Sequence, residues 1–72
     1  MQTTVNPRHK NIHYGNEVKA KVEEYGMSIA EFARRIGCSR NNVYNIFNRD
    51  FINMQLLQKI SDVLDFDFIH EL

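Results

Sequence analysis

The segment from Ser39 to Arg49 is rich in side chains that carry hydrogen-bond donors and acceptors. Its polar residues between these two are Arg40, Asn41, Asn42, Tyr44, Asn45 and Asn48. Asparagine is a mediocre helix former, so four of them in one short helix would be a poor choice for stability alone. The guanidinium of arginine and the amide of asparagine match the major-groove edges of guanine and adenine. These residue types therefore favour contacts with DNA bases over a merely solvated face.

A helix over about residues 40–48 would hold these side chains on one face. Ser39 is a favourable N-cap residue, and Cys38 and Val43 occupy the two positions of a hydrophobic staple. The apolar residues that recur at helical spacing on the other face are Val43, Ile46 and Phe47. The pattern predicts an amphipathic helix whose polar face is exposed.

A shorter helix, expected over residues 29–36, precedes it. Ser28 and Glu31 fit a capping box, in which the Ser28 hydroxyl accepts from the N–H of residue 31 and the Glu31 carboxylate accepts from the N–H of residue 28. The apolar residues of its inner face are Ile29, Phe32, Ala33 and Ile36. Gly37 follows at the place where many helices end in a left-handed residue. The two helices and their tight turn thus span about residues 28–48.

Two longer amphipathic segments flank this pair of helices. The first is expected from residue 12 or 15 to Tyr25, because Gly15 would weaken a helix that began at Ile12. Its inward residues are expected to be Tyr14, Val18, Val22 and Tyr25. The second covers residues 54–66, and its apolar residues at helical spacing are Leu56, Leu57, Ile60, Val63 and Leu64. Asn53 is either the N-cap of this second segment or a contact to DNA phosphate.

The chain ends in an apolar tail, for which Asp67 is the expected N-cap of a short fifth helix. Its large apolar residues are Phe66, Phe68, Ile69 and Leu72. Part of this surface must enter the core. A remainder left exposed as a patch would suit self-association.

Length and composition are those of one small domain. Seventy-two residues allow a modest core, one cysteine cannot form an internal disulfide, and no apolar run approaches the roughly 20 residues of a membrane span. No apolar signal segment is visible, so we expect a cytoplasmic protein with no membrane partner. Residues 1–11 are expected to be a flexible arm and residues 12–72 the folded domain. Arg8, His9 and Lys10 are either incidental charge on this arm, which we favour, or contacts to the DNA backbone.

The net charge is zero, yet the charges are unevenly distributed along the chain. Residues 1–49 carry eight Lys/Arg and four Asp/Glu, whereas residues 50–72 carry one lysine and five acidic residues. Positive charge therefore gathers around the polar helix and negative charge at the far end of the sequence. We expect such a polarised neutral domain to bind DNA weakly unless it is dimerised or joined to another module.

From about Ile12 to Leu72 the chain resembles the DNA-binding domains of lambda-type repressors, Cro proteins and the XRE family of bacterial regulators. The residues that carry the resemblance are Phe32-Ala33, Gly37-Cys38-Ser39, Val43 and Ile46. The resemblance implies an all-α fold, a compact lambda-repressor-like bundle of four to five helices with a helix-turn-helix at about residues 28–48. The family often has Gln at the start of the first helix of this motif, where it contacts a phosphate. This chain has Ile29, so Ser28, helix-start N–H groups or another side chain must make that contact.

The resemblance, together with the polar face, implies a small transcriptional regulator that binds a double-stranded DNA operator. The predicted base contacts are Arg40, Asn41, Asn42, Tyr44 and Asn45. The predicted phosphate contacts are Ser28, Ser39, Asn48 and Arg49. In the resembled family the C-terminal region forms dimers, which implies a homodimer through the segment Phe66–Leu72.

Other classes of function find less support in the residues. His9, His13 and His70 are scattered, with no cysteine or carboxylate at the spacing of metal ligands or a catalytic triad. We therefore expect no enzyme activity, no metal and no cofactor. A protein-interaction module on the same fold is the main alternative, favoured by the zero net charge and by Ile29. An antitoxin-type regulator, which binds both its operator and a partner protein, is a third interpretation.

Overall fold

Side-chain caps and left-handed residues divide the chain into short helices. The computed structural model describes residues 12–71, which contain five helices and no strand. The helices are α2 (Tyr14–Glu24), α3 (Ile29–Ile36), α4 (Arg40–Phe47), α5 (Met54–Leu64) and α6 (Phe68–Glu71). This confirms the predicted all-α class, with α3 and α4 as the helix-turn-helix. The predicted arm over residues 1–11 and the final residue, Leu72, lie outside the described part of the chain.

The predicted N-caps are all present. Ser28, Ser39 and Asn53 each accept a hydrogen bond from the backbone N–H three residues further on, at 3.1, 3.1 and 2.9 Å. Asp67 caps α6 in the same way, because its Oδ1 accepts from the N–H groups of Ile69 and His70 at 3.0 and 3.1 Å. Helix starts are therefore encoded by single polar residues, as expected from the unpaired N–H groups of a first turn.

The structure corrects two of the predicted helix ends. Helix α5 stops at Leu64 instead of continuing to residue 66, because Asp65 adopts a left-handed conformation with φ 52°. Aspartate enters this region more readily than most residues, but nothing in the local sequence required it here. Helix α2 begins at Tyr14, with His13 as an N-cap whose Nδ1 accepts from the N–H of Asn16 at 3.0 Å. Gly15 thus lies inside the first turn of α2.

One core joins all five helices and the loop before α5. Its buried apolar residues are Val18, Val22, Phe32, Ala33, Ile36, Val43, Ile46, Phe47, Ile52, Leu57, Ile60, Leu64 and Phe68. The rings of Phe32 and Phe47 are stacked with centroids 6.1 Å apart, which fixes α3 against α4. Ile52 lies in the loop between α4 and α5 and is nevertheless a core residue.

The inward face of α2 is narrower than the sequence predicted. Val18 and Val22 are buried and Tyr14 is half-buried, but Tyr25 is 45% exposed. Helix α2 ends at Glu24, so the ring of Tyr25 lies beyond the last helical turn, and Met27 packs against the core after the chain turns. The prediction that Tyr25 faces inward was wrong.

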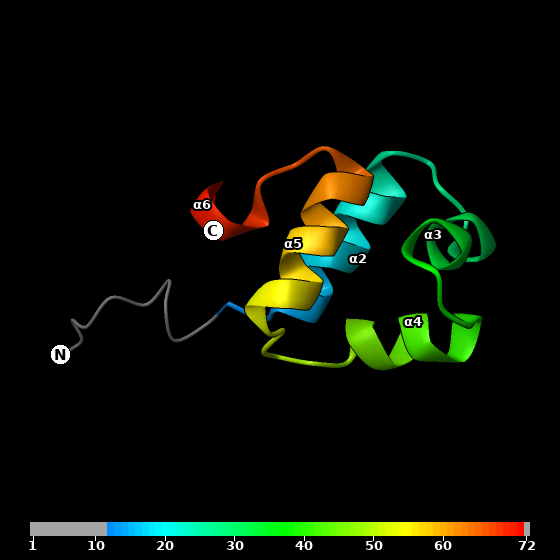
Figure 1. The fold of residues 1–72 in the computed structure, drawn as a ribbon, viewed down its shortest axis with the longest axis horizontal. Coiled ribbons are helices and arrows are strands. Elements are labelled where there is room, and N and C mark those ends of the chain that lie inside the picture. The colour runs from blue at the N-terminus through cyan, green and yellow to red at the C-terminus, as the bar shows by residue number, and fades with distance from the viewer. Residues whose placement is uncertain (1–11, 72) are drawn as a thin grey trace, which may run out of the picture.

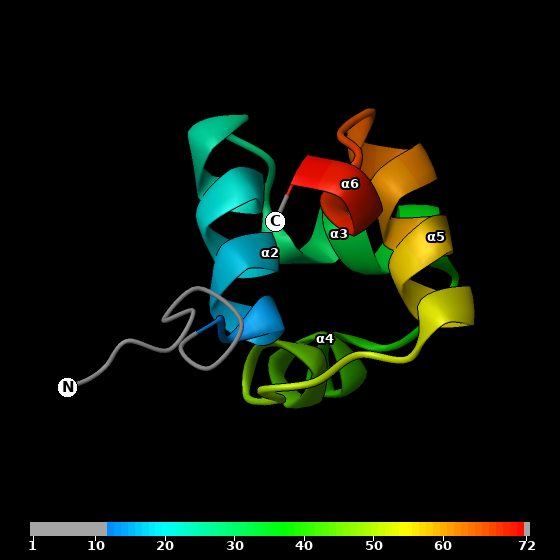
Figure 2. The same cartoon turned by 90° about the vertical axis from the view of Figure 1, so that its left-hand side faces the viewer.

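The arrangement of the helices leaves α4 at one end of the molecule. In Figures 1 and 2, α4 lies at the bottom of both views, beyond the lower end of α2, whereas α6 lies higher. Helix α4 packs on α2 and α3, and α6 packs on α5. None of the helices between residues 12 and 71 is long and apolar enough to cross a membrane. The fold therefore separates the helix with the polar face from the apolar tail.

Candidate nucleic-acid interface

Helix α4 buries one face and presents the other to solvent. Its buried residues are Val43, Ile46 and Phe47. Its exposed residues are the five predicted base contacts: Arg40, Asn41, Asn42, Tyr44 and Asn45. Tyr44 is 52% exposed, a large fraction for a tyrosine that has no polar partner within residues 12–71. The structure thus brings all five side chains onto one continuous surface of a helix whose other side is held by the core.

The start of α4 combines a capping hydroxyl with the positive end of the helix dipole. Ser39 Oγ accepts from the N–H of Asn42, and its carbonyl accepts from the N–H of Val43 at 3.1 Å. A hydroxyl that accepts in this way still has its own proton to donate. Ser28 has the same chemistry at the start of α3, where its Oγ accepts from the N–H of Glu31. Both serines are exposed, so each can donate to an anion near a helix start.

Glu31 binds two arginines of its own helix. Its Oε2 accepts from Arg34 Nη2 and from Arg35 Nε, each at 2.6 Å. The predicted capping box is therefore only half formed: the Ser28 hydroxyl caps Glu31, but the Glu31 carboxylate turns to the arginines. Hydrogen bonds from Arg34 and then Arg35 lower the pKa of Glu31 to about 2. Charge-assisted bonds to two guanidinium groups outcompete one bond to a backbone N–H.

The ion pairs of Glu31 with Arg34 and Arg35, here called the arginine clamp, partly neutralise these two arginines. Arg34 and Arg35 share one carboxylate. Arg40 and Arg49 are exposed, and neither is in an ion pair with any residue from 12 to 71. Among the arginines of residues 12–71, Arg40 at the start of α4 and Arg49 just beyond its end are therefore the two whose charge is not offset by an ion pair within this range.

The end of α4 is joined to the start of α2 by backbone hydrogen bonds. The N–H of Gly15 donates to the carbonyl of Arg49 at 2.9 Å, and the N–H of Tyr14 donates to the carbonyl of Asp50 at 3.2 Å. Unpaired N–H groups of one helix start thus satisfy carbonyls just beyond another helix. The backbone of Arg49, a predicted phosphate contact, is fixed by this junction.

Gly15 allows the two segments to approach this closely. A Cβ at this position would lie 2.3 Å from the carbonyl oxygen of Phe47, 2.5 Å from that of Ile46 and 2.6 Å from that of Arg49. No side chain other than hydrogen fits there. Sequence reasoning treated Gly15 only as a weak point at a helix start and missed this role. The available signal was a glycine within an otherwise amphipathic segment, since glycine is used where the backbone must approach another group closely.

Two exposed apolar side chains near α4 were also missed. Phe51 is 69% exposed and Met54 is 61% exposed. The Phe51 ring packs edge-on against Tyr14, with centroids 6.5 Å apart. Phe51 lies in the loop that leads to α5, Met54 is the first residue of α5, and Asn53 between them is the N-cap of α5. The role of Asn53 as the N-cap of α5 is thereby confirmed.

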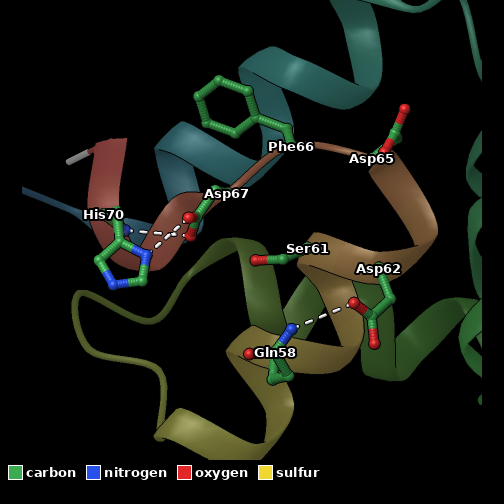
Figure 3. Close-up of a pocket in the computed structure, with 7 residues that line it drawn as sticks. All are labelled: Gln58, Ser61, Asp62, Asp65, Phe66, Asp67 and His70. Carbon is green, nitrogen blue, oxygen red and sulfur yellow. Dashed lines mark hydrogen bonds and ion pairs between the residues drawn. The ribbon is translucent and has the colours of Figure 1, made fainter.

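A second surface feature is a hollow between α5 and the tail (Figure 3). Its lining residues are Gln58, Ser61, Asp62, Asp65, Phe66, Asp67 and His70. The polar groups are largely paired with one another: Gln58 Nε2 donates to Asp62 Oδ1 at 3.1 Å, and His70 Nδ1 lies 2.6 Å from Asp67 Oδ2. The bond with His70 lowers the pKa of Asp67. Three carboxyl groups make this surface unfavourable for a phosphate backbone.

The apolar tail is mostly covered. Phe68 is 1% exposed and belongs to the core, whereas Phe66 and Ile69 are half-buried. The ammonium of Lys21 lies 4.1 Å from the centre of the Phe66 ring and 3.2 Å from a carboxylate oxygen of Glu24. The described part of the tail therefore offers less free apolar surface than the sequence suggested.

These observations define a helix-turn-helix domain with an exposed polar second helix. A family model described as Helix-turn-helix matches residues 18–69, which is most of the chain. The chain belongs to the Cro/C1-type (XRE) helix-turn-helix family of DNA-binding regulatory domains. No curated protein and no solved structure matches the chain significantly. The resemblance based on Phe32-Ala33, Gly37 and Ser39 is thereby confirmed.

Proposed function

We propose that this protein is a transcriptional regulator that binds double-stranded DNA in a sequence-specific manner, with α4 in the major groove. The observation that carries the proposal is the exposed face of α4. It presents Arg, Asn and Tyr side chains without partners from residues 12–71, on a helix held rigidly by its buried face. The proposed base contacts are Arg40, Asn41, Asn42, Tyr44 and Asn45, and the groove admits a helix of this width.

Phosphate contacts position the domain in this proposal. Ser28 and Ser39 donate their hydroxyl protons to the DNA backbone at the starts of α3 and α4. Asn48 and Arg49 contact the backbone beyond the end of α4, where both are exposed. Ile29 is half-buried against the core, and in this proposal Ser28, N–H groups at the start of α3 or another side chain make the phosphate contact that glutamine makes in related domains.

Regulation is steric in this scheme: an occupied operator blocks or recruits polymerase. Two histidines among residues 12–71 have structural partners: His13 is the N-cap of α2, and His70 is paired with Asp67. We assign the protein to the cytoplasm, where its DNA would be accessible.

Dimerisation through Phe66–Leu72 stays a prediction. Its support is the half-buried apolar surface of Phe66 and Ile69 on the outside of the bundle. Sedimentation equilibrium of the free protein and of its DNA complex tests it. A dimer on DNA predicts an operator with two half-sites related by a twofold axis and spaced by about one helical turn, 34–36 Å. A complex of one protein with a single half-site would contradict it.

The proposed function is tested by selecting bound duplexes from a random DNA library and titrating the enriched sequence at several salt concentrations. We expect an enriched motif and an affinity that falls as salt rises. Arg40→Ala or Asn41→Ala should cost about 1–3 kcal/mol at one base position and relax specificity there. Arg49→Ala should weaken all sequences alike and reduce the salt dependence.

The result that overturns the proposal is equally clear. Absence of enrichment, with no binding even at low salt, would favour a protein-interaction module or an antitoxin-type regulator on the same fold. Uniform loss of affinity in both kinds of variant would show that the division into base contacts and phosphate contacts is wrong.

A further inference from the structure

The buried face of α4 determines which polar residues point most directly outward. Successive residues of an α-helix are rotated by about 100°. Taking Val43, Ile46 and Phe47 as the inward direction, Asn41 lies about 170° and Asn45 about 150° away from it. The remaining exposed residues of α4, which are Arg40, Asn42 and Tyr44, lie about 70–110° away, on the flanks. Asn41 and Asn45 are therefore the outermost pair.

The amides of this pair are uncommitted in the described structure. No hydrogen bond joins the side chain of Asn41 or Asn45 to any residue between 12 and 71. Asn53 shows the contrast, because its Oδ1 is used to cap α5. Asn53 thus has a structural role, whereas the amide donors and acceptors of Asn41 and Asn45 are available to a ligand.

The spacing of the pair matches the spacing of bases. Four residues of α-helix rise about 6 Å, and two base-pair steps of DNA rise about 6.8 Å. When α4 enters the groove with its rise directed mainly along the DNA axis, the amides of Asn41 and Asn45 meet bases two steps apart. An asparagine amide offers one donor and one acceptor side by side, which matches the N7 acceptor and N6 donor of adenine. Guanine offers two acceptors at this edge and cytosine only a donor, so neither pairs with both atoms of the amide.

We infer that the half-site recognised by α4 contains two adenines separated by one base pair, read by Asn41 and Asn45. The inference rests on the proposed function and specifies its ligand. Tyr44 lies on the flank next to this pair, where its ring can meet the methyl group of a thymine. Arg40 lies at the start of the helix, on the side toward a neighbouring base pair or phosphate.

The test uses the full chain and the duplex enriched from the random library. Each adenine of the enriched motif is replaced in turn by 7-deaza-adenine, which lacks only the N7 acceptor. We expect affinity to fall about 5- to 100-fold at two adenines two steps apart, in line with the discrimination of a bidentate pair. Other adenines of the duplex serve as controls and should respond little.

Asn41→Ala and Asn45→Ala assign each adenine to its residue. In each variant, one of the two 7-deaza substitutions should have no further effect, because the hydrogen bond it removes is already lost. Asn16→Ala is the matched control, since Asn16 is also an exposed helical asparagine but lies on α2. Asn41 and Asn45 are both exposed, so thermal unfolding should confirm that the variants fold like the wild type.

Two results overturn the inference and are distinguishable from each other. An enriched motif without the adenine pair, or one insensitive to 7-deaza-adenine, refutes the assignment of Asn41 and Asn45 while sequence-specific binding stands. No enriched motif at all refutes the proposed function and the inference with it.

Discussion

Gly15→Ala should destabilise the protein although it places a better helix former in α2. The added Cβ would lie 2.3–2.6 Å from three carbonyl oxygens of the segment from Ile46 to Arg49. All three belong to the backbone, so no side-chain rotation relieves the overlap. Either the start of α2 or the end of α4 must shift. That shift lengthens the bonds from Gly15 to Arg49, now 2.9 Å, and from Tyr14 to Asp50, now 3.2 Å.

The magnitude follows from three terms. Overpacking a close contact costs about 1–3 kcal/mol, and weakening one buried backbone hydrogen bond costs about 0.5–1.5 kcal/mol. The higher helix propensity of alanine offsets part of this loss, because replacing glycine by alanine inside a helix raises the free energy of unfolding by about 1 kcal/mol. The net loss in the free energy of unfolding is about 0.5–3.5 kcal/mol, with a central value of about 2 kcal/mol. In a domain of this size the melting temperature should fall by about 5–20 °C.

Thermal unfolding followed by circular dichroism measures this change. Asn16→Ala is the control, because it improves helix propensity at the next residue, which is exposed, and should alter stability by less than about 0.5 kcal/mol. Gly26→Ala is a second control: its cost of about 1–2 kcal/mol comes from the left-handed backbone alone, since nothing lies within 4 Å of the added Cβ. Amide NMR shifts of residues 46–50 should move in Gly15→Ala and stay in place in Gly26→Ala. A melting temperature at or above that of the wild type would refute the reasoning.

Two other consequences concern caps and charge. Ser39→Ala removes the oxygen that accepts from the N–H of Asn42, so the free energy of unfolding should fall by about 1 kcal/mol; chemical denaturation measures it, and an unchanged midpoint would contradict the cap. The folded-state pKa of Glu31 is lowered from 4.5 to about 2, chiefly by Arg34. Its contribution to stability is therefore present above pH 4.5 and lost as pH falls toward 2. Glu31→Gln should make the loss of stability across this range smaller, and added salt should reduce the difference between the two proteins, since the group is exposed. Identical pH dependence of the two proteins would show that the arginine clamp does not act in solution.

The sequence predicted the local features of the fold well. Ser28, Ser39 and Asp67 were predicted as caps, and Asn53 as one of two alternatives, because a cap depends on one side chain and the N–H groups of the next turn. The buried face of α4 followed from the spacing of its apolar residues for a similarly local reason. The five exposed residues of α4 were therefore identified as one surface before their placement was known.

Features that depend on packing between distant segments were not predictable in this way. Asp65 ends α5 early, Tyr25 lies outside the core and Ile52 lies inside it. A local choice was also predicted wrongly: the Glu31 carboxylate binds Arg34 and Arg35, three and four residues further along the same helix, instead of the N–H of residue 28. In each case a residue has several possible contacts, and the sequence pattern does not show which of them is the most stable.

The sequence by itself determined which residues begin each helix, which face of each helix is apolar and where the polar face of α4 lies, because these properties arise within one or two helical turns. Only the tertiary structure decided how α4 is held. Gly15 lies more than 30 residues before Arg49 in the chain, and its role appears only when the start of α2 meets the end of α4 at backbone distance. The lack of a side chain at Gly15 matters only because backbone carbonyls of another segment lie where a Cβ would be.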